Sequence, residues 1–214
     1  MSPADKSTPA DRKSRWGGVF ENPWVSIVIR ALVDGGRVAR LGRVLRPFAF
    51  SSVLEVGCGV GECAPLWGPG YCGLDNSLPS VTFAARRNPH GMFVAGDALR
   101  LPFRDAAFDA VLLIDTSHHL TDELLRHVLE EMRRVARRYL VVSDPVRRPG
   151  QSAFSRFFYG LDRGACFRTA DAMRALLLSA PGLVLEHSAR FRTLPGMYVH
   201  QAFVLRKDGR TNST

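Results

Sequence analysis

The chain has 214 residues, of which 46% are hydrophobic and 23% are charged, and this composition excludes general disorder, collagen and coiled coil. Its 29 basic and 20 acidic residues give a net charge of +9, which allows a nucleic-acid or anionic-membrane partner. Because the arginines are scattered rather than gathered in one block, a nucleic-acid partner is not favoured. The four cysteines form no CxxC pair, so we expect reduced thiols and no metal site.

The N-terminal part divides into a polar tail and a helical segment. Residues 1–15 are rich in Ser, Pro, Asp and Lys and predict a disordered tail, so the folded domain is expected to span 16–214. Apolar residues recur at helical spacing on both sides of Gly35-Gly36, which predicts two helices within 16–50. No apolar run approaches the roughly 18–20 residues of a membrane span, and the N-terminus has no apolar signal core. We expect a cytoplasmic protein without a membrane span, a monomer or a homodimer.

From residue 52 onward, short apolar runs alternate with helical stretches. Runs without polar alternation fit strands that are covered on both faces, which is typical of a parallel sheet in an α/β fold. Strands are expected at 53–57, 71–75, 92–97, 108–115, 139–144, 183–191 and 198–206, and helices near 60–67, 78–87, 121–137 and 169–180. The last two strands flank a turn at 193–196 and predict an antiparallel hairpin.

The predicted fold is therefore a Rossmann-like, mostly parallel seven-stranded sheet with a C-terminal antiparallel hairpin and helices on both faces. Residues 146–180 are longer than a minimal crossover and contain an aromatic segment at 154–159. This stretch is expected to be a lid or an acceptor-binding insertion. The alternative is that the aromatic residues pack a helix onto the core.

The most informative segment is Glu55-Val56-Gly57-Cys58-Gly59-Val60-Gly61, directly after the first strand of the sheet. Glycines there let the backbone turn sharply and approach a ligand, at the sheet edge where α/β proteins bind ligands. A dinucleotide fits poorly, because the third glycine of its GxGxxG fingerprint falls on Glu62 and the nearby acids would repel a pyrophosphate. The acids suit a ligand with an ammonium group and no phosphate, such as S-adenosylmethionine (SAM).

The loop resembles motif I, ExGxGxG, of the class I SAM-dependent methyltransferases, and three further motifs follow in that family's order. Residues 71–77 (YCGLDNS) resemble the end of the family's second strand, whose acid binds both ribose hydroxyls. Residues 96–98 (GDA), followed by LPF and FDAV, resemble the ubiquinone-type small-molecule branch. There the acid accepts from the adenine amino group and the next residue's amide contacts the ring. Residues 114–120 (IDTSHHL) resemble that branch's fourth-strand exit.

The resemblance implies SAM as cofactor, S-adenosylhomocysteine (SAH) as its product and a small-molecule acceptor. The residues expected to bind the cofactor are Glu55, Gly57, Cys58, Gly59, Gly61, Asp75, Asn76, Asp97, Ala98 and Asp115. Other roles stay open for some of them. The glycines could permit tight packing, Cys58 could be a small buried residue, Asp75 could cap a helix and Asp97 could hold a turn.

The implied reaction is in-line displacement, in which an acceptor atom attacks the sulfonium methyl group and SAH leaves. The donor is already activated, so the enzyme positions the partners and excludes water, and no metal is needed. A hydroxyl acceptor would benefit from a base, for which histidine is suited. The candidates, in order, are His119, His118, Asp144 and His200. A structural or pocket-lining role is the alternative for His119, and the roles of His118 and Asp115 are open in the same way.

Three functions remain open from the sequence. The first is methylation of a small molecule, most simply at oxygen, in secondary-metabolite or surface-polysaccharide biosynthesis, because residues 140–200 are loosely similar to methyltransferases of such pathways. The second is an RNA or protein methyltransferase, suggested by the net charge of +9. The fourth strand lacks the N/D-P-P-Y/F motif of many nucleic-acid amino-methyltransferases. The third is a non-catalytic module.

This sequence departs from the family at one point: the Lys-Pro-Gly-Gly turn that the family has before its fifth strand is replaced by Arg137-Arg138-Tyr139.

Overall fold

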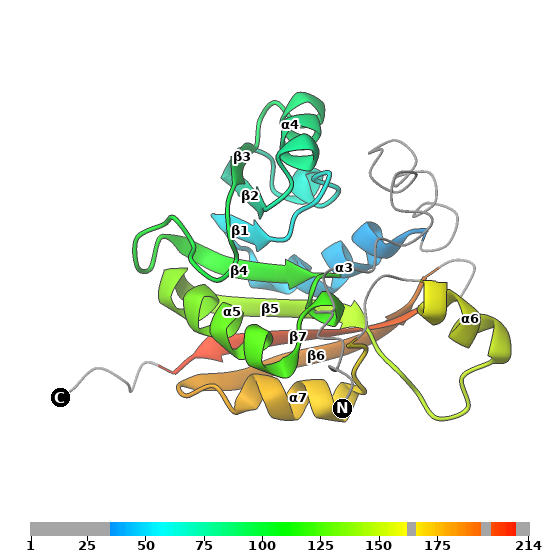
Figure 1. Cartoon of the computed structure of the whole chain (residues 1–214). Helices are drawn as coiled ribbons and strands as arrows, with labels where there is room; N and C mark the ends of the chain where they lie inside the picture. The colour runs from blue at the N-terminus through cyan, green and yellow to red at the C-terminus, as the bar shows by residue number, and fades with distance from the viewer. Residues whose placement is uncertain (1–34, 162–165, 194–197, 209–214) are drawn as a thin grey trace, which may run out of the picture.

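The computed structural model describes residues 35–161, 166–193 and 198–208 (Figure 1). The polar tail at 1–15, the first of the two helices expected within 16–50 and most of the turn at 193–196 lie outside the described residues. Within the described ranges, no helix is long and apolar enough to cross a membrane.

The centre of the fold is a seven-stranded sheet with the strand order β3-β2-β1-β4-β5-β7-β6. The first five strands along the chain are parallel, and β7 runs antiparallel to both β5 and β6. The predicted mostly parallel sheet with a C-terminal antiparallel hairpin is thereby confirmed. The strands are β1 (Val53–Val56), β2 (Tyr71–Asp75), β3 (Met92–Ala95), β4 (Phe108–Ile114), β5 (Ala136–Pro145), β6 (Leu183–Arg192) and β7 (Val199–Lys207).

Helices lie on both faces of this sheet (Figure 1). The described helices are α3 (Arg37–Leu45), α4 (Leu78–Arg87), α5 (Asp122–Val135), α6 (Ala153–Leu161), which lies beyond the end of the sheet, and α7 (Ala170–Leu178). Three of them begin at a hydroxyl cap: Ser77 for α4, Thr121 for α5 and Thr169 for α7 each accept a backbone N–H of the first turn.

Neighbouring residues of one strand serve opposite faces, as the pleat requires. Leu54 of β1 belongs to the core shared with α5 and α7, whereas Val53 belongs to the core shared with α3. Leu113 and Leu112 of β4 divide in the same way. All four side chains are fully buried, which explains why these strands read as unbroken apolar runs in the sequence.

Two local predictions were wrong. The helix expected near 60–67 is absent, and only the short 3₁₀ turns Ala64–Leu66 and Gly68–Gly70 form there. Pro65 and Pro69 lack the backbone N–H that a continuing helix needs. In addition, α5 ends at Val135 and β5 begins at Ala136, so Arg137 belongs to the strand and not to the helix expected over 121–137, and the strand starts before the expected residue 139.

Candidate active site

The loops that follow β1, β2, β4 and β5 gather at the carboxyl edge of the sheet, where α/β proteins bind ligands (Figure 1). The backbone N–H groups of Gly57 and Cys58 both donate to the Leu74 carbonyl, at 2.7 and 3.0 Å, so the loop after β1 folds over the end of β2. The hydroxyl of Thr116, after β4, donates to the Gly57 carbonyl at 3.3 Å. These contacts hold three strand ends together.

The three glycines of this loop differ in what surrounds them. A Cβ at Gly57, where φ is +73°, would lie 2.4 Å from the Thr116 hydroxyl, and one at Gly61 would lie 2.9 Å from the Phe93 ring. Both positions therefore serve packing. Gly59 has φ +51°, but nothing in the described part of the chain lies within 4 Å of the place where a Cβ would stand. With respect to residues 35–161, 166–193 and 198–208, the loop is open only at this middle glycine, which makes it the part that can receive a ligand.

Asp75 lies beside that opening. Its Oδ2 accepts the Gly59 N–H at 2.8 Å and its Oδ1 accepts the Ser77 N–H at 2.9 Å. The helix cap of α4 is Ser77 rather than Asp75, so the carboxylate ties the glycine loop to the β2–α4 loop. Asn76, between the two, is exposed. The Asp75 carbonyl also accepts the Gly96 N–H at 3.0 Å, which brings the end of β3 to the same place.

The residues after β3 complete this side of the site. Asp97 is exposed, and its Oδ1 accepts the Leu99 N–H at 2.9 Å, so it holds a turn as well as lying near the strand ends. Ala98 is half-buried and packs against the main core. Cys58 is buried, and a Cβ at Gly73 of β2 would lie 2.7 Å from its sulfur. Burial raises the pKa of the Cys58 thiol well above its usual value, so this residue is a packed, protonated thiol.

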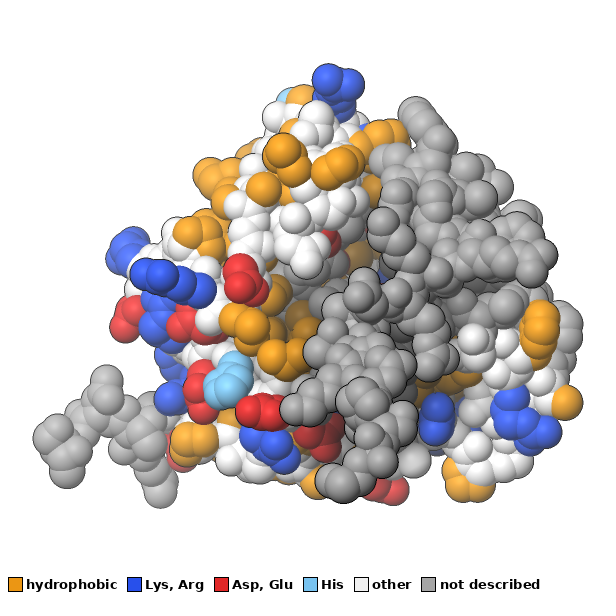
Figure 2. Space-filling model, in the orientation of Figure 1, with side chains coloured by type: hydrophobic (Ala, Val, Ile, Leu, Met, Phe, Trp, Pro, Cys, Tyr) orange, Lys and Arg blue, Asp and Glu red, His pale blue; other side chains and the backbone are white. Residues whose placement is uncertain are grey.

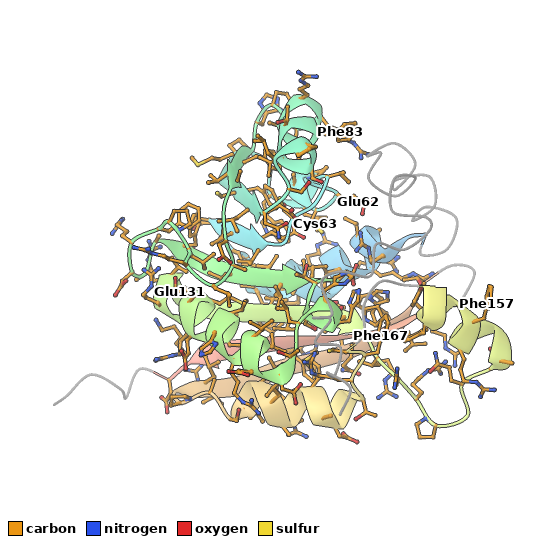
Figure 3. The ribbon with its side chains drawn as sticks, in the orientation of Figure 1. Glu62, Cys63, Phe83, Glu131, Phe157 and Phe167 are labelled. Atoms are coloured by element: carbon orange, nitrogen blue, oxygen red, sulfur yellow. The ribbon has the colours of Figure 1, made fainter. Side chains whose placement is uncertain are left out.

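Glu55 and Glu62, whose charges were expected to disfavour a pyrophosphate, do not face the opening. Glu55 is only 3% exposed, and its carboxylate accepts the Tyr71 hydroxyl of β2. Burial raises the pKa of Glu55 to about 7. Glu62 forms an ion pair with Arg37 of α3. The argument that acids beside the loop repel a pyrophosphate therefore rests on Asp75 alone. Glu55 is buried, and Glu62 is neutralised by Arg37 (Figure 3 labels Glu62).

Asp115, expected to bind the cofactor, is 8% exposed and lies in a buried charge cluster. It forms an ion pair with Arg37, and its Oδ1 lies 3.2 Å from Nδ1 of His200. His200, a candidate base, is fully buried on β7 and stacks on Phe191, with the ring centroids 5.3 Å apart. Neither side chain reaches the surface of the site in this arrangement.

Sequence reasoning missed Arg37, although the chain carries a signal for it. Residues 37, 41 and 45 recur every four positions and form the buried face of α3. A charged residue in line with two buried leucines must find partners of opposite charge. Arg37 finds them in Asp115, at the end of β4, and in Glu62 of the glycine loop.

The remaining candidate bases lie on the β4–α5 loop and at the end of β5. Nδ1 of His118 lies 2.6 Å from Oδ1 of Asp144, and the second oxygen of Asp144 accepts the Ser117 hydroxyl. Both His118 and Asp144 are at most 3% exposed. The His118 ring stacks on Phe167 with centroids 4.8 Å apart, and the ring of the exposed His119 is 4.1 Å away (Figure 3 labels Phe167).

Arg168, which follows the α6 insertion, anchors this loop. Its Nη1 donates to the Ser117 carbonyl at 2.9 Å, and its Nη2 donates to the Leu120 carbonyl at 2.8 Å. Its Nε donates to Asp122, at the start of α5, at 2.8 Å. The Cys166 N–H donates to the His118 carbonyl at 3.0 Å. The segment after the insertion therefore fixes the backbone that carries His118.

Residues 54–139 match a family model described as a methyltransferase domain. These residues form a methyltransferase domain. This matched region contains the glycine loop, Asp75, the GDA segment and the two adjacent histidines, so every motif that carried the resemblance falls within it.

Relatives of this methyltransferase domain include O-methyltransferase cnsE of Penicillium expansum, 33% identical over 142 residues, which cover 60% of this chain and 50% of the relative. A fatty-acid O-methyltransferase of Mycolicibacterium smegmatis is 48% identical over 73 residues, covering 31% of this chain and 27% of the relative. The matches thus span half or less of these relatives' own lengths.

The fold has solved counterparts. A magnesium protoporphyrin IX methyltransferase from Synechocystis PCC 6803, crystallised with SAH, superposes with a TM-score of 0.62 at 19% identity. The superposition covers 80% of this chain and 82% of the other. At this identity the likeness establishes the fold alone, over a larger part of the chain than residues 54–139.

Proposed function

We propose that the chain is a SAM-dependent methyltransferase that methylates an oxygen atom of a small-molecule acceptor. The observation that carries the proposal is the opening at Gly59, where no atom of the described residues lies within 4 Å of a Cβ position and the Asp75 carboxylate lies beside the loop. This opening lies in the matched methyltransferase domain. At Gly57 and Gly61, the other two glycines of the loop, neighbouring side chains fill the space that a Cβ would take.

The residues at the carboxyl edge of β1, β2 and β3 fit the cofactor. Gly59 gives backbone access, and Asp75 can accept charge-assisted hydrogen bonds from a ribose diol. Asn76, Asp97 and Ala98 line the same edge through the Asp75–Gly96 backbone contact. When bound, SAM would supply a methyl group that is already activated by its sulfonium. Glu55 stabilises the start of the glycine loop by accepting a hydrogen bond from the Tyr71 hydroxyl.

The chain also offers a proton acceptor for a hydroxyl. A carboxylate accepts from Nδ1 of His118, so the tautomer held by Asp144 carries its basic lone pair on Nε2. Ser117 and Arg168 restrain the carboxylate and the loop, which keeps the imidazole orientation constant. His118 is therefore our candidate base and Asp144 its positioning residue. Because His119 is exposed on the same turn, it takes second place.

A binding and transfer experiment on the full chain tests the proposal. SAM and SAH should stabilise the protein in a thermal melt, and NADH should not. Labelled SAM should then transfer its methyl group to a hydroxylated member of an acceptor panel drawn from secondary-metabolite and polysaccharide precursors. Stabilisation by NADH and not by SAM would overturn the assignment.

The net charge of +9 keeps tRNA and basic protein extracts in the same panel. Methyl transfer to either of them, with a steep salt dependence for tRNA, would replace the small-molecule proposal. SAM binding without transfer to any acceptor would instead support a non-catalytic module.

A further inference from the structure

A cavity lies beside α6, just past the end of β5. Its volume is about 450 Å³, within the range of small-molecule sites. Its lining residues are Arg147, Arg148, Gly150, Gln151, Arg156, Tyr159 and Gly160. Three of these seven carry a permanent positive charge, and none of the described residues in the lining is an acid. Figure 2 shows basic side chains over this part of the surface, at the lower right of the view.

The three guanidinium groups are not neutralised within the described part of the chain. The structure records no ion pair between any of them and a carboxylate there. Arg156 donates to the Gln151 carbonyl at 2.9 Å, which fixes it against the β5–α6 loop. The Nε of Arg148 is buried and has no hydrogen-bond partner among the described residues. A buried cationic donor without a partner is costly unless a ligand supplies the acceptor.

The cavity is connected to the candidate base through a row of rings. Tyr159 forms part of the cavity wall, and its hydroxyl donates to the Val146 carbonyl at 3.0 Å. The Tyr159 ring lies 4.7 Å from the Phe167 ring, which stacks on His118 at 4.8 Å. Phe167 is therefore the one ring between the cavity wall at Tyr159 and His118 in this row.

We infer that this arginine cavity binds an anionic group of the acceptor, a carboxylate or a phosphate. The inference rests on the proposed function and narrows its substrate to an organic anion. Guanidinium groups bind both kinds of oxyanion through paired hydrogen bonds, and clustered positive charge rewards a ligand that neutralises it. A neutral acceptor without an oxyanion would leave the buried Nε of Arg148 without a partner among the described residues.

Calorimetric titration of the full chain saturated with SAH tests this inference at constant ionic strength. The probes are inorganic phosphate, phenyl phosphate, 4-hydroxybenzoate and the neutral methyl ester of 4-hydroxybenzoate. We expect at least one organic anion to bind ten times more tightly than the ester. Comparing the affinities of phenyl phosphate and 4-hydroxybenzoate shows whether the cavity prefers a phosphate or a carboxylate.

Substitutions then locate the binding. Arg148→Gln and Arg156→Gln should each weaken the bound anion at least fivefold, while Arg148→Lys weakens it less. Arg174→Gln, on the exposed face of α7, removes the same charge elsewhere and should change nothing. Thermal melts without ligand confirm folding, and Arg148→Gln should melt no lower than wild type because it removes an unpartnered buried donor.

The two proposals fail separately. Loss of SAH binding in wild type would refute the methyltransferase assignment, whatever the anions do. If SAH binds but no anion does, or if Arg148→Gln and Arg156→Gln both behave like Arg174→Gln, the anion site is refuted and the proposed function stands.

Discussion

Nδ1 of His118 lies 2.6 Å from Oδ1 of Asp144, although the two residues are 26 positions apart and follow different strands. The pairing of β4 with β5 brings them together, because Ile114 and Ser143 are register partners in those strands. The same carboxylate holds Ser117, so one buried acid orients two side chains of the β4–α5 loop. A positioned imidazole of this kind is the arrangement that proton transfer from a hydroxyl requires.

Asp144→Asn should therefore lower kcat for an oxygen acceptor by about 100-fold, since general-base catalysis contributes roughly 10²–10⁴-fold. The amide cannot hold the same imidazole tautomer, while the cofactor contacts near Gly59 are untouched. Labelled-methyl kinetics with the acceptor found in the panel measure kcat and KM, and SAH titration checks the cofactor site. His119→Asn is the matched control and should change kcat less than threefold. A larger loss in His119→Asn than in Asp144→Asn would make His119 the base.

Gly59→Asp should fold but lose SAM binding. Asp tolerates a positive φ better than most residues, and the position has open space, so the fold is kept. The new carboxylate would occupy the opening and repel Asp75. In wild type, SAM at 100 times its Kd contributes about 2.7 kcal/mol, a thermal shift of roughly 5–10 °C for a domain of this size. Gly68→Asp is the control, because Gly68 also has a positive φ, +55°, and nothing within 4 Å. Its SAM shift should match that of wild type.

Glu55→Gln should change how stability depends on pH. Burial raises the pKa of Glu55 from 4.5 to about 7, so the unfolded chain loses this proton at a lower pH than the folded protein does. The free energy of unfolding therefore falls as pH rises from 4.5 to 7, and the cost is complete above 7. Glutamine keeps an acceptor for Tyr71 without the charge, and should stabilise the protein at pH 8 by up to about 3 kcal/mol.

Urea unfolding at pH 4.5 and pH 8 measures this effect. Glu55→Gln and wild type should have nearly equal stability at pH 4.5 and differ at pH 8. Glu130→Gln, on the exposed face of α5, is the control and should behave as wild type at both values. An equal difference between Glu55→Gln and wild type at the two pH values would mean that the carboxyl is not the titrating group.

Arg37→Met should destabilise the protein by about 3–5 kcal/mol, because it leaves Asp115 buried without its cation. Adding Asp115→Asn should recover part of this loss, since no uncompensated charge remains. Chemical denaturation of the two variants and of Arg43→Met, an exposed position on the same helix, measures the difference. Arg43→Met should stay within about 0.5 kcal/mol of wild type. Equal effects at positions 37 and 43 would contradict the buried cluster.

Much of the fold could be predicted from the sequence because burial on both faces leaves apolar runs that show where strands lie. The limits of α4 matched residues 78–87, and α5 fell within 121–137, since hydroxyl caps and terminal charges mark their ends. The failure at 60–67 came from giving apolar spacing more weight than Pro65 and Pro69, which prevent a helix there.

The site was less predictable, because residue spacing does not show which partner a charged side chain has. The sequence placed Glu55 and Glu62 beside the loop but could not reveal that Tyr71 and Arg37 engage them. These partners lie on α3 and β2. Only the packing of these elements against the loop determines whether Glu55 and Glu62 face the opening. The arginine cavity was hidden for the same reason, since its members were read as part of a scattered excess of basic residues.

The hydrogen bonds from Arg168 to the carbonyls of Ser117 and Leu120 affect how the acceptor specificity can evolve or be engineered. The segment that follows the α6 insertion therefore stabilises the backbone of the loop that carries His118. A chimera that exchanges only residues 146–161 would keep these hydrogen bonds, whereas one extended through residue 168 would transplant or lose them. New acceptor preferences are therefore most safely recruited by exchanging the shorter block.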